Sequence, residues 1–260
     1  APGRFVAGES SAVVQIAARD AARPVFTVEP AATGGVNGQP TLVSNVETLA
    51  QLAVLARLGP TRFAEVGVPA EVGTALLTVH RGADSRVVEA PIGIAMMDLF
   101  GGTPWRGVLT GGYHGNWLDS ATAAATVVSR DALAAVGGSL GAGVLLALPM
   151  TACPLVESAP LVERMAAETV GQCGPCINGL PAIASVLSSL ATGTAGDGDL
   201  TRLRRWCGMV DGRGACAHPD GVAGFVRSLL SSFESEVEWH LRGGCGLPYQ
   251  ALLPLGELAA

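Results

Sequence analysis

The sequence predicts an α+β protein built from more than one domain. Its 260 residues exceed the roughly 100 to 200 residues typical of a single domain, and its composition, 49% hydrophobic and 15% charged, is that of a folded globular protein. The pattern also changes along the chain, from mixed to strand-like to helical. We therefore expect domains at residues 1–73, 74–150 and 151–260.

The first part mixes short apolar runs with Gly and Pro and resembles the end of an α/β domain. A helix is predicted over residues 45–59, because apolar residues recur there on one helical face: Leu49, Leu52, Ala53 and Ala56.

The middle part has short strand-like segments separated by glycine-rich turns. A helical piece is predicted near residues 94–100, and the expected strands are 74–79, 87–90, 107–110 and 144–148. Together they predict a small β-rich module.

From Pro160 onward the pattern is helical, with helices expected at residues 161–169, 180–190, 198–210 and 222–241. The last of these has one apolar stripe, formed by Val222, Phe225, Val226, Leu229, Leu230, Phe233 and Val237. Such a stripe is typical of a helix in a bundle.

Charge and composition exclude several classes of function. The net charge is −6, which argues against nucleic acid as a partner, and all 16 basic residues are Arg, which excludes a Schiff-base lysine. No apolar run is long enough to span a membrane, so we expect a soluble or peripheral protein. The opening residues read as the middle of a domain, which indicates a fragment. A CxxC pair without secretion features favours metal or redox use of the six Cys in a reducing, cytoplasmic compartment.

The strongest chemical signal is the sequence Cys173-Gly174-Pro175-Cys176, followed much later by Cys216. Two thiolates two residues apart can bind one metal centre from a single turn, and a third can join them from a loop before another helix. A helix beginning near Ile177 would favour their negative charge. The alternatives are a structural zinc site, a redox-active pair or buried free thiols; the redox pair is disfavoured because no βαβ pattern surrounds the motif.

Three segments carry a resemblance that covers essentially the whole chain. Residues 168–176 (ETVGQCGPC) are similar to the ESCGQCxPC segment of the NADH-binding FMN and iron-sulfur subunit of complex I and of its soluble hydrogenase and formate dehydrogenase relatives. Residues 41–48 (TLVSNVET) resemble that family's TVxNVET segment, and residues 8–12 (GESSA) resemble its GEETAL segment.

The resemblance implies FMN, NADH and a [4Fe-4S] cluster as cofactors. It implies that Glu9 serves catalysis and that the flavin and nicotinamide sites are lined by Phe5, Gly8, Glu9, Ser10, Ser44, Asn45 and Thr48. Ser10 replaces a second Glu, and Ser44 replaces an Asn. By themselves, residues 8–10 read more readily as a surface turn, and Asn45 could simply cap a helix. The family's glycine-rich FMN phosphate loop would lie before Ala1.

The main departure is Val170, which stands where the family has its first cluster cysteine. The cluster then takes a fourth ligand from elsewhere, or is held by three cysteines with a labile iron, or has been lost. Our first candidate for the fourth ligand is Cys245, reached through a turn at the two preceding glycines. Cys207 and His218 follow, although Cys207 reads more simply as a buried cysteine and His218 as a solvated loop residue. Cys153 is expected to be a buried structural thiol.

In fold, the resemblance implies the end of an FMN and NADH domain, a β-grasp-like module of the soluble-ligand-binding type and a helical bundle carrying the cluster. His80 and His114 of the middle module are expected to be solvated loop residues. In function, it implies an NADH dehydrogenase subunit that passes electrons from NADH through FMN and the cluster. The acceptor would be a ferredoxin-like or thioredoxin-like partner or a quinone pathway. The subunit would be cytoplasmic and peripheral to a membrane complex. The alternatives are a non-catalytic electron-transfer adaptor and a zinc-stabilised interaction module.

Overall fold

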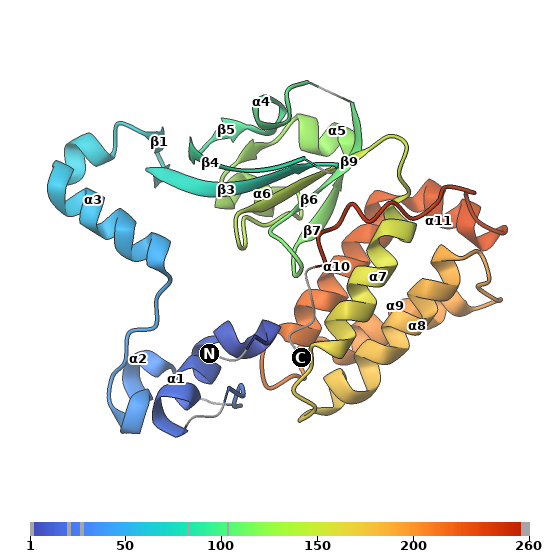
Figure 1. Ribbon diagram of the computed structural model, residues 1–260, viewed down its shortest axis with the longest axis horizontal. Coiled ribbons are helices and arrows are strands. Elements are labelled where there is room, and N and C mark those ends of the chain that lie inside the picture. The colour runs from blue at the N-terminus through green and yellow to red at the C-terminus, as the bar shows by residue number, and fades with distance from the viewer. Residues whose placement is uncertain (1–2, 20–21, 27–28, 83, 103, 256–260) are drawn as a thin grey trace.

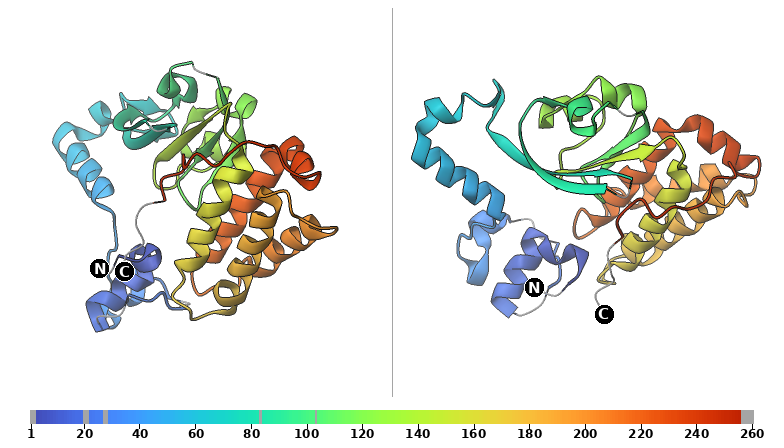
Figure 2. Two further views of the ribbon diagram at one scale, coloured as in Figure 1. Left: turned by 45° about the vertical axis from the view of Figure 1, so that its right-hand side comes forward. Right: turned by 45° about the horizontal axis from the view of Figure 1, so that its top comes forward.

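The computed structural model describes residues 3–19, 22–26, 29–82, 84–102 and 104–255. The first helices of the chain lie next to one end of a helical bundle, and a mixed sheet packs against that bundle (Figure 1). Two further views show the same separation into three regions (Figure 2). The observed class is therefore the mixed α and β structure that the sequence predicts.

The first region consists of helices and two-residue strands: η1 (Phe5–Gly8), α1 (Ser10–Arg19), α2 (Ala31–Gly34), η2 (Val36–Gly38), α3 (Val46–Phe63), β1 (Gly67–Val68) and β2 (Glu71–Val72). Helix α3 begins directly after Asn45, as predicted, and continues past the predicted end at Gly59. Gly59 has a φ of 77° and interrupts the helical geometry just before Pro60. A residue with a side chain would be strained in that conformation.

The second region is a five-stranded sheet in the order β4-β3-β9-β6-β7. Its strands are β3 (Thr74–Arg81), β4 (Asp84–Pro91), β6 (Trp105–Thr110), β7 (Asn116–Asp119) and β9 (Val144–Pro149), and each predicted strand lies within one of them. Strands β3 and β9 are parallel, and the other neighbours are antiparallel. Beside this sheet lie the small pair β5 (Ile94–Ala95) and β8 (Val127–Val128) and the helices α4 (Met96–Phe100), α5 (Ser120–Ala124) and α6 (Arg130–Ala135).

Alternation along the strands gives the sheet two buried faces. Val108 and Leu145 pack in the core that the sheet shares with α4, α5 and α6, whereas Leu109 and Leu146 belong to the core of the helical bundle. Because successive side chains of a strand point to opposite faces, β6 and β9 connect the two cores.

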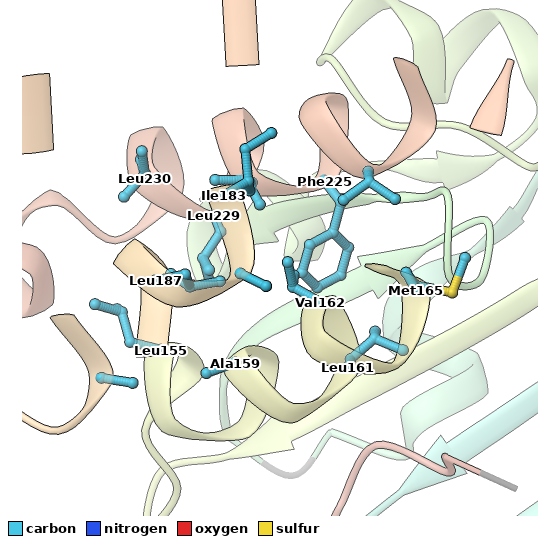
Figure 3. Close-up of a cluster of buried hydrophobic side chains, with 14 of the residues drawn as sticks. Leu155, Ala159, Leu161, Val162, Met165, Ile183, Leu187, Phe225, Leu229 and Leu230 are labelled. Atoms are coloured by element: carbon cyan, nitrogen blue, oxygen red, sulfur yellow. The ribbon is translucent and has the colours of Figure 1, made fainter. Parts of the chain in front are cut away.

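The third region comprises α7 (Pro154–Ala167), a π-helical turn η3 (Pro175–Gly179), α8 (Leu180–Ala191), α9 (Asp199–Val210), α10 (His218–Ser232) and α11 (Glu234–Leu241). Their core is mainly aliphatic and includes the rings of Phe225 and Phe233. Figure 3 shows side chains of α7, α8 and α10 meeting there, among them Leu155, Val162, Ile183, Leu187, Phe225 and Leu229.

The expected single helix over residues 222–241 is wrong, because the chain breaks at Phe233 (φ −133°, ψ 48°) between α10 and α11. Phe233 is 3% exposed, and its ring lies 5.6 Å from that of Trp117 on the sheet. Gly107 of β6 makes room for it, since a Cβ there would lie 2.5 Å from the Phe233 ring. Packing on the sheet therefore overrides the helical pattern. None of the described helices is both long and apolar enough to cross a bilayer.

Candidate metal centre

Cys173 and Cys216 lie near enough to Cys176 to influence its pKa. Cys173 precedes η3, Cys176 lies within η3 and Cys216 lies in the loop before α10. The amide of Ile177 donates to the carbonyl of Cys173 at 3.0 Å, which closes the turn that places both cysteines on one side. Cys176 is 5% exposed, and the other two are half-buried. A partly buried group of three thiols at the start of a helical segment is suited to a thiophilic metal centre.

The electrostatics of the three thiols are linked. Burial, opposed by a hydrogen bond with the Thr169 side chain and reinforced by the neighbouring Cys173 and Cys216, raises the pKa of Cys176 to about 12. Burial also raises the pKa of Cys216, with the Glu9 charge adding to the shift. Without a cation Cys176 and Cys216 are therefore neutral thiols at neutral pH, and a bound metal centre would release their protons.

Among the described residues, neither Cys207 nor His218 completes the group of three. Cys207 is fully buried in α9, where its pKa is raised by burial and lowered by the charge of Arg227. His218 is 2% exposed, so the expectation of a solvated loop residue is wrong. Both of its ring nitrogens already have partners, Nδ1 with His114 Nε2 at 3.0 Å and Nε2 with the Met165 carbonyl at 2.9 Å.

The structure contradicts the expectation that Cys245 is the fourth ligand. Gly243 and Gly244 do form a positive-φ turn, with φ of 117° and 101°, but this turn brings Cys245 to Cys153 and His240. His240 bonds the carbonyl of Leu190 near the end of α8, whereas Cys176 precedes the start of that helix. At 1.5 Å per residue, the intervening helical stretch separates the two groups by roughly 20 Å. Cys153 is 1% exposed, which confirms that it is buried.

Phe5 and Glu9, two of the residues assigned to the flavin site, lie beside Cys216. All three line a cavity of about 210 Å³, together with His114 and His218. The ring centroid of Phe5 lies 4.7 Å from that of His114 and 5.7 Å from that of His218. The structure thus brings the first residues of the chain to the loop that carries Cys216.

The two histidines of this cavity are uncharged at neutral pH. Burial, and then the proximity of His218, lower the pKa of His114 to about 4, and burial lowers the pKa of His218. His114 is half-buried and His80 lies within β3, so the expectation that both are solvated loop residues is wrong.

Glu9 has a local structural role as well. Its carboxylate accepts hydrogen bonds from the Ala12 amide at 3.1 Å and from the Ser11 hydroxyl, which caps the start of α1. Gly8 is exposed at the end of η1, and Ser10 lines a second cavity with Glu9.

Ser44, Asn45 and Thr48 lie elsewhere. Asn45 Oδ1 accepts from the Thr48 amide at 2.7 Å, so Asn45 is the cap of α3. Both residues line a separate cavity of about 530 Å³ between α3 and β3, and Ser44 is exposed beside them. The structure therefore does not bring this segment to Glu9.

Sequence reasoning missed the partners of Cys245. The short segment from His240 to Cys245 brings two ligand types close together in sequence and could have suggested a site. Cys153 carries no such signal, because only the fold brings α7 to the end of α11.

Comparisons with known proteins place the three cysteines within a described region. Residues 157–240 match the family described as the NADH-ubiquinone oxidoreductase-F iron-sulfur binding region. This range includes Cys173, Cys176 and Cys216 and excludes Cys153 and Cys245.

Relatives are found among subunits of respiratory and hydrogenase complexes. The chain is 27% identical to an NADH-quinone oxidoreductase subunit of Rhizobium meliloti, over 92% of this chain and 59% of that protein. It is 25% identical to the NADP-reducing hydrogenase subunit HndC of Solidesulfovibrio fructosivorans, over 92% of this chain and 50% of the relative. The chain thus spans between half and three-fifths of these relatives. A solved NAD+-reducing [NiFe]-hydrogenase in the H2-reduced state superposes with a TM-score of 0.82 at 25% identity, over 92% of this chain and 42% of that one.

Proposed function

Because the chain is related to the C-terminal part of NADH-oxidising flavoprotein subunits, we propose that it holds a [4Fe-4S]-type cluster on Cys173, Cys176 and Cys216. In the complete protein this cluster would take electrons from NADH through FMN and pass them to another subunit. The observation that carries the proposal is the meeting of these three thiols inside the iron-sulfur region. Their donor set fits the cluster, since thiolate is the usual protein ligand of iron-sulfur centres.

We also propose the finer organisation that the resemblance implies. Residues 1–73 would complete an FMN and NADH domain, residues 74–150 would form the β-grasp-like module, and residues 151–260 would form the cluster-binding bundle. The five-stranded sheet, which separates two helical segments along the chain, supports this division. We expect other iron-sulfur subunits, ferredoxin-like or thioredoxin-like, as partners on the cytoplasmic side of a membrane complex.

When bound, FMN accepts a hydride from NADH and a cluster transfers single electrons. Residues of this chain lie where a flavin and a cluster would approach each other. Phe5 and Glu9 border the same cavity as Cys216, and this proximity supports electron transfer from a flavin bound beside Phe5 and Glu9 to a cluster bound at Cys216. The neutral imidazoles of His114 and His218 leave that cavity without a positive charge at neutral pH. Burial of Cys176 would keep water away from a cluster bound to its sulfur.

Anaerobic purification followed by iron, sulfide and zinc analysis and an absorption spectrum tests the cluster. We expect a brown protein containing iron and sulfide, and Cys176→Ser should lose most of both. Cys207→Ser is the matched control, because it makes the same chemical change at a cysteine outside the group, and it should retain both. A colourless protein with zinc at Cys176 would instead support the zinc-stabilised interaction module.

Two further measurements address the departures from the family. Val170→Cys restores a thiol at the family's fourth position, so it should slow the loss of iron in air compared with the unaltered chain. In the complete protein, NADH should bleach the FMN absorption. If FMN bound but NADH never bleached it, the electron-transfer adaptor would be favoured. Ser10, which stands in place of a carboxylate, supports that alternative.

A further inference from the structure

A second sulfur-containing group lies at the far end of the bundle. Cys153 and His240 are each 1% exposed, and Cys245 is half-buried. Cys153 Sγ lies 3.2 Å from His240 Nε2, and the ligand atoms of all three residues lie within 4.8 Å of one another. Nothing in the proposed electron path uses these residues.

We propose that Cys153, His240 and Cys245 bind a zinc ion. Zn–S bonds of about 2.3 Å and Zn–N bonds of about 2.0 Å at tetrahedral angles place sulfur and nitrogen roughly 3.6 Å apart and two sulfurs roughly 3.8 Å apart. The observed spacing therefore requires only small shifts. A cubane attaches each thiolate to a different iron and so holds its ligands farther apart, which makes this compact group a poor match for a cluster.

The histidine is already oriented for metal binding. Its Nδ1 lies 3.0 Å from the carbonyl oxygen of Leu190. Because a carbonyl can only accept, Nδ1 carries the proton, and the lone pair of Nε2 is directed at the sulfur of Cys153. A backbone carbonyl that fixes the tautomer and the ring in this way is the usual outer partner of a metal-bound histidine.

The position of the cysteines also suits a cation. Cys153 is the N-cap residue of the 14-residue helix α7, whose first backbone amides partly offset the cost of burying a thiolate there. Binding would displace the thiol protons of Cys153 and Cys245 to solvent without any redox change. Zinc matches a mixed thiolate and imidazole set. Since no other described His, Cys, Asp or Glu joins the group, the fourth position is left to water on the open side of Cys245.

The ion would have a structural role. It would tie the start of α7 to the end of α11 and to the first residues of the C-terminal segment, which runs back to α7 beyond Cys245 (Figure 1). This inference does not depend on the proposed cluster, because the two groups lie at opposite ends of α8 and the match to the iron-sulfur region excludes Cys153 and Cys245.

The test is metal analysis of the whole 260-residue chain, purified anaerobically with its iron, exposed to Zn²⁺ and freed of excess metal. We expect about one zinc per chain in addition to iron. Cys245→Ser changes a half-buried loop residue and should lower zinc retention about tenfold or more while leaving iron unchanged. Cys176→Ser should do the reverse, and Cys207→Ser should leave both metals in place.

Co²⁺ in place of Zn²⁺ provides a spectroscopic readout of the same site. The unaltered chain should show the visible absorption of a tetrahedral cobalt-thiolate site, and Cys245→Ser should lose it. Failure to retain zinc or cobalt, equal zinc in Cys245→Ser, loss of iron rather than zinc from that variant, or a Cys153–Cys245 disulfide in the anaerobic protein would each overturn the proposal.

Discussion

Glu157 offers a direct test of how the C-terminal segment is held. Its side chain is fully buried on α7, and its carboxylate accepts hydrogen bonds from the backbone amides of Gln250 at 2.6 Å and Leu252 at 2.8 Å. Glu157→Ala removes both acceptors. Glu157→Gln retains one oxygen but turns an NH2 group toward the second amide, so that two donors face each other.

Hydrogen bonds to a charged group contribute about 1.5–3 kcal/mol each. The two bonds would then total roughly 3–6 kcal/mol, an upper bound, because the freed amides lie near the surface and regain water. We expect Glu157→Ala to lower the free energy of opening of the segment by about 2–3 kcal/mol and Glu157→Gln by about half as much. A loss of 2 kcal/mol corresponds to roughly 30-fold faster exchange of the Leu252 amide.

Native-state hydrogen exchange at Gln250 and Leu252 measures this opening. Glu163→Gln is the matched control, because Glu163 lies on the same helix, is exposed and bonds a side chain rather than this segment. If the amide of Leu252 exchanged at the same rate in Glu157→Ala as in the unaltered chain, Glu157 would not anchor the segment and the reasoning would fail.

Three further outcomes are expected. Gly179→Ala should destabilise the bundle by about 1–3 kcal/mol in urea unfolding, because its Cβ would lie 2.2 Å from a side chain of α9. Since burial, with the proximity of His218, lowers the pKa of His114 from 6.5 to about 4, the unfolded chain binds more protons between these values. Stability should therefore fall as the pH drops through that window, and melting of His114→Gln should depend less on pH there. Asn45→Ala removes the acceptor for the Thr48 amide and should cost about 1 kcal/mol, whereas Asn45→Asp should preserve stability in the same thermal melts.

Local patterns predicted most of the secondary structure. The strands of the sheet and the start of α3 at Asn45 follow from residue periodicity and capping, which act over a few neighbouring positions. The break at Phe233 did not follow, because the apolar stripe continues through it. The ring of Phe233 packs against Trp117, a contact between residues far apart in sequence. Such tertiary packing leaves no mark in a helical pattern.

The site shows the same limit. The CxxC spacing and the resemblance together predicted a site at Cys173, Cys176 and Cys216, and the structure places Cys173 and Cys216 near enough to Cys176 to influence its pKa. The two glycines correctly predicted the turn before Cys245. Which residues Cys245 then contacts depends on where α11 ends relative to α7. Sequence spacing carries no information about that distance. The assignment of Glu9 to catalysis stays a prediction.

The π-helical turn η3 joins the cysteine motif to the helix that follows. A π-turn contains one more residue than an α-turn, so it takes up that residue without the rotation of about 100° that an added residue causes in an α-helix. Cys176 within the turn and Leu180 directly after it are both buried. A one-residue deletion that restored α-helical winding would therefore leave the buried face of α8 directed inward while moving Cys176 relative to Cys173. The length of this turn matters to the spacing of the thiols rather than to the packing of α8.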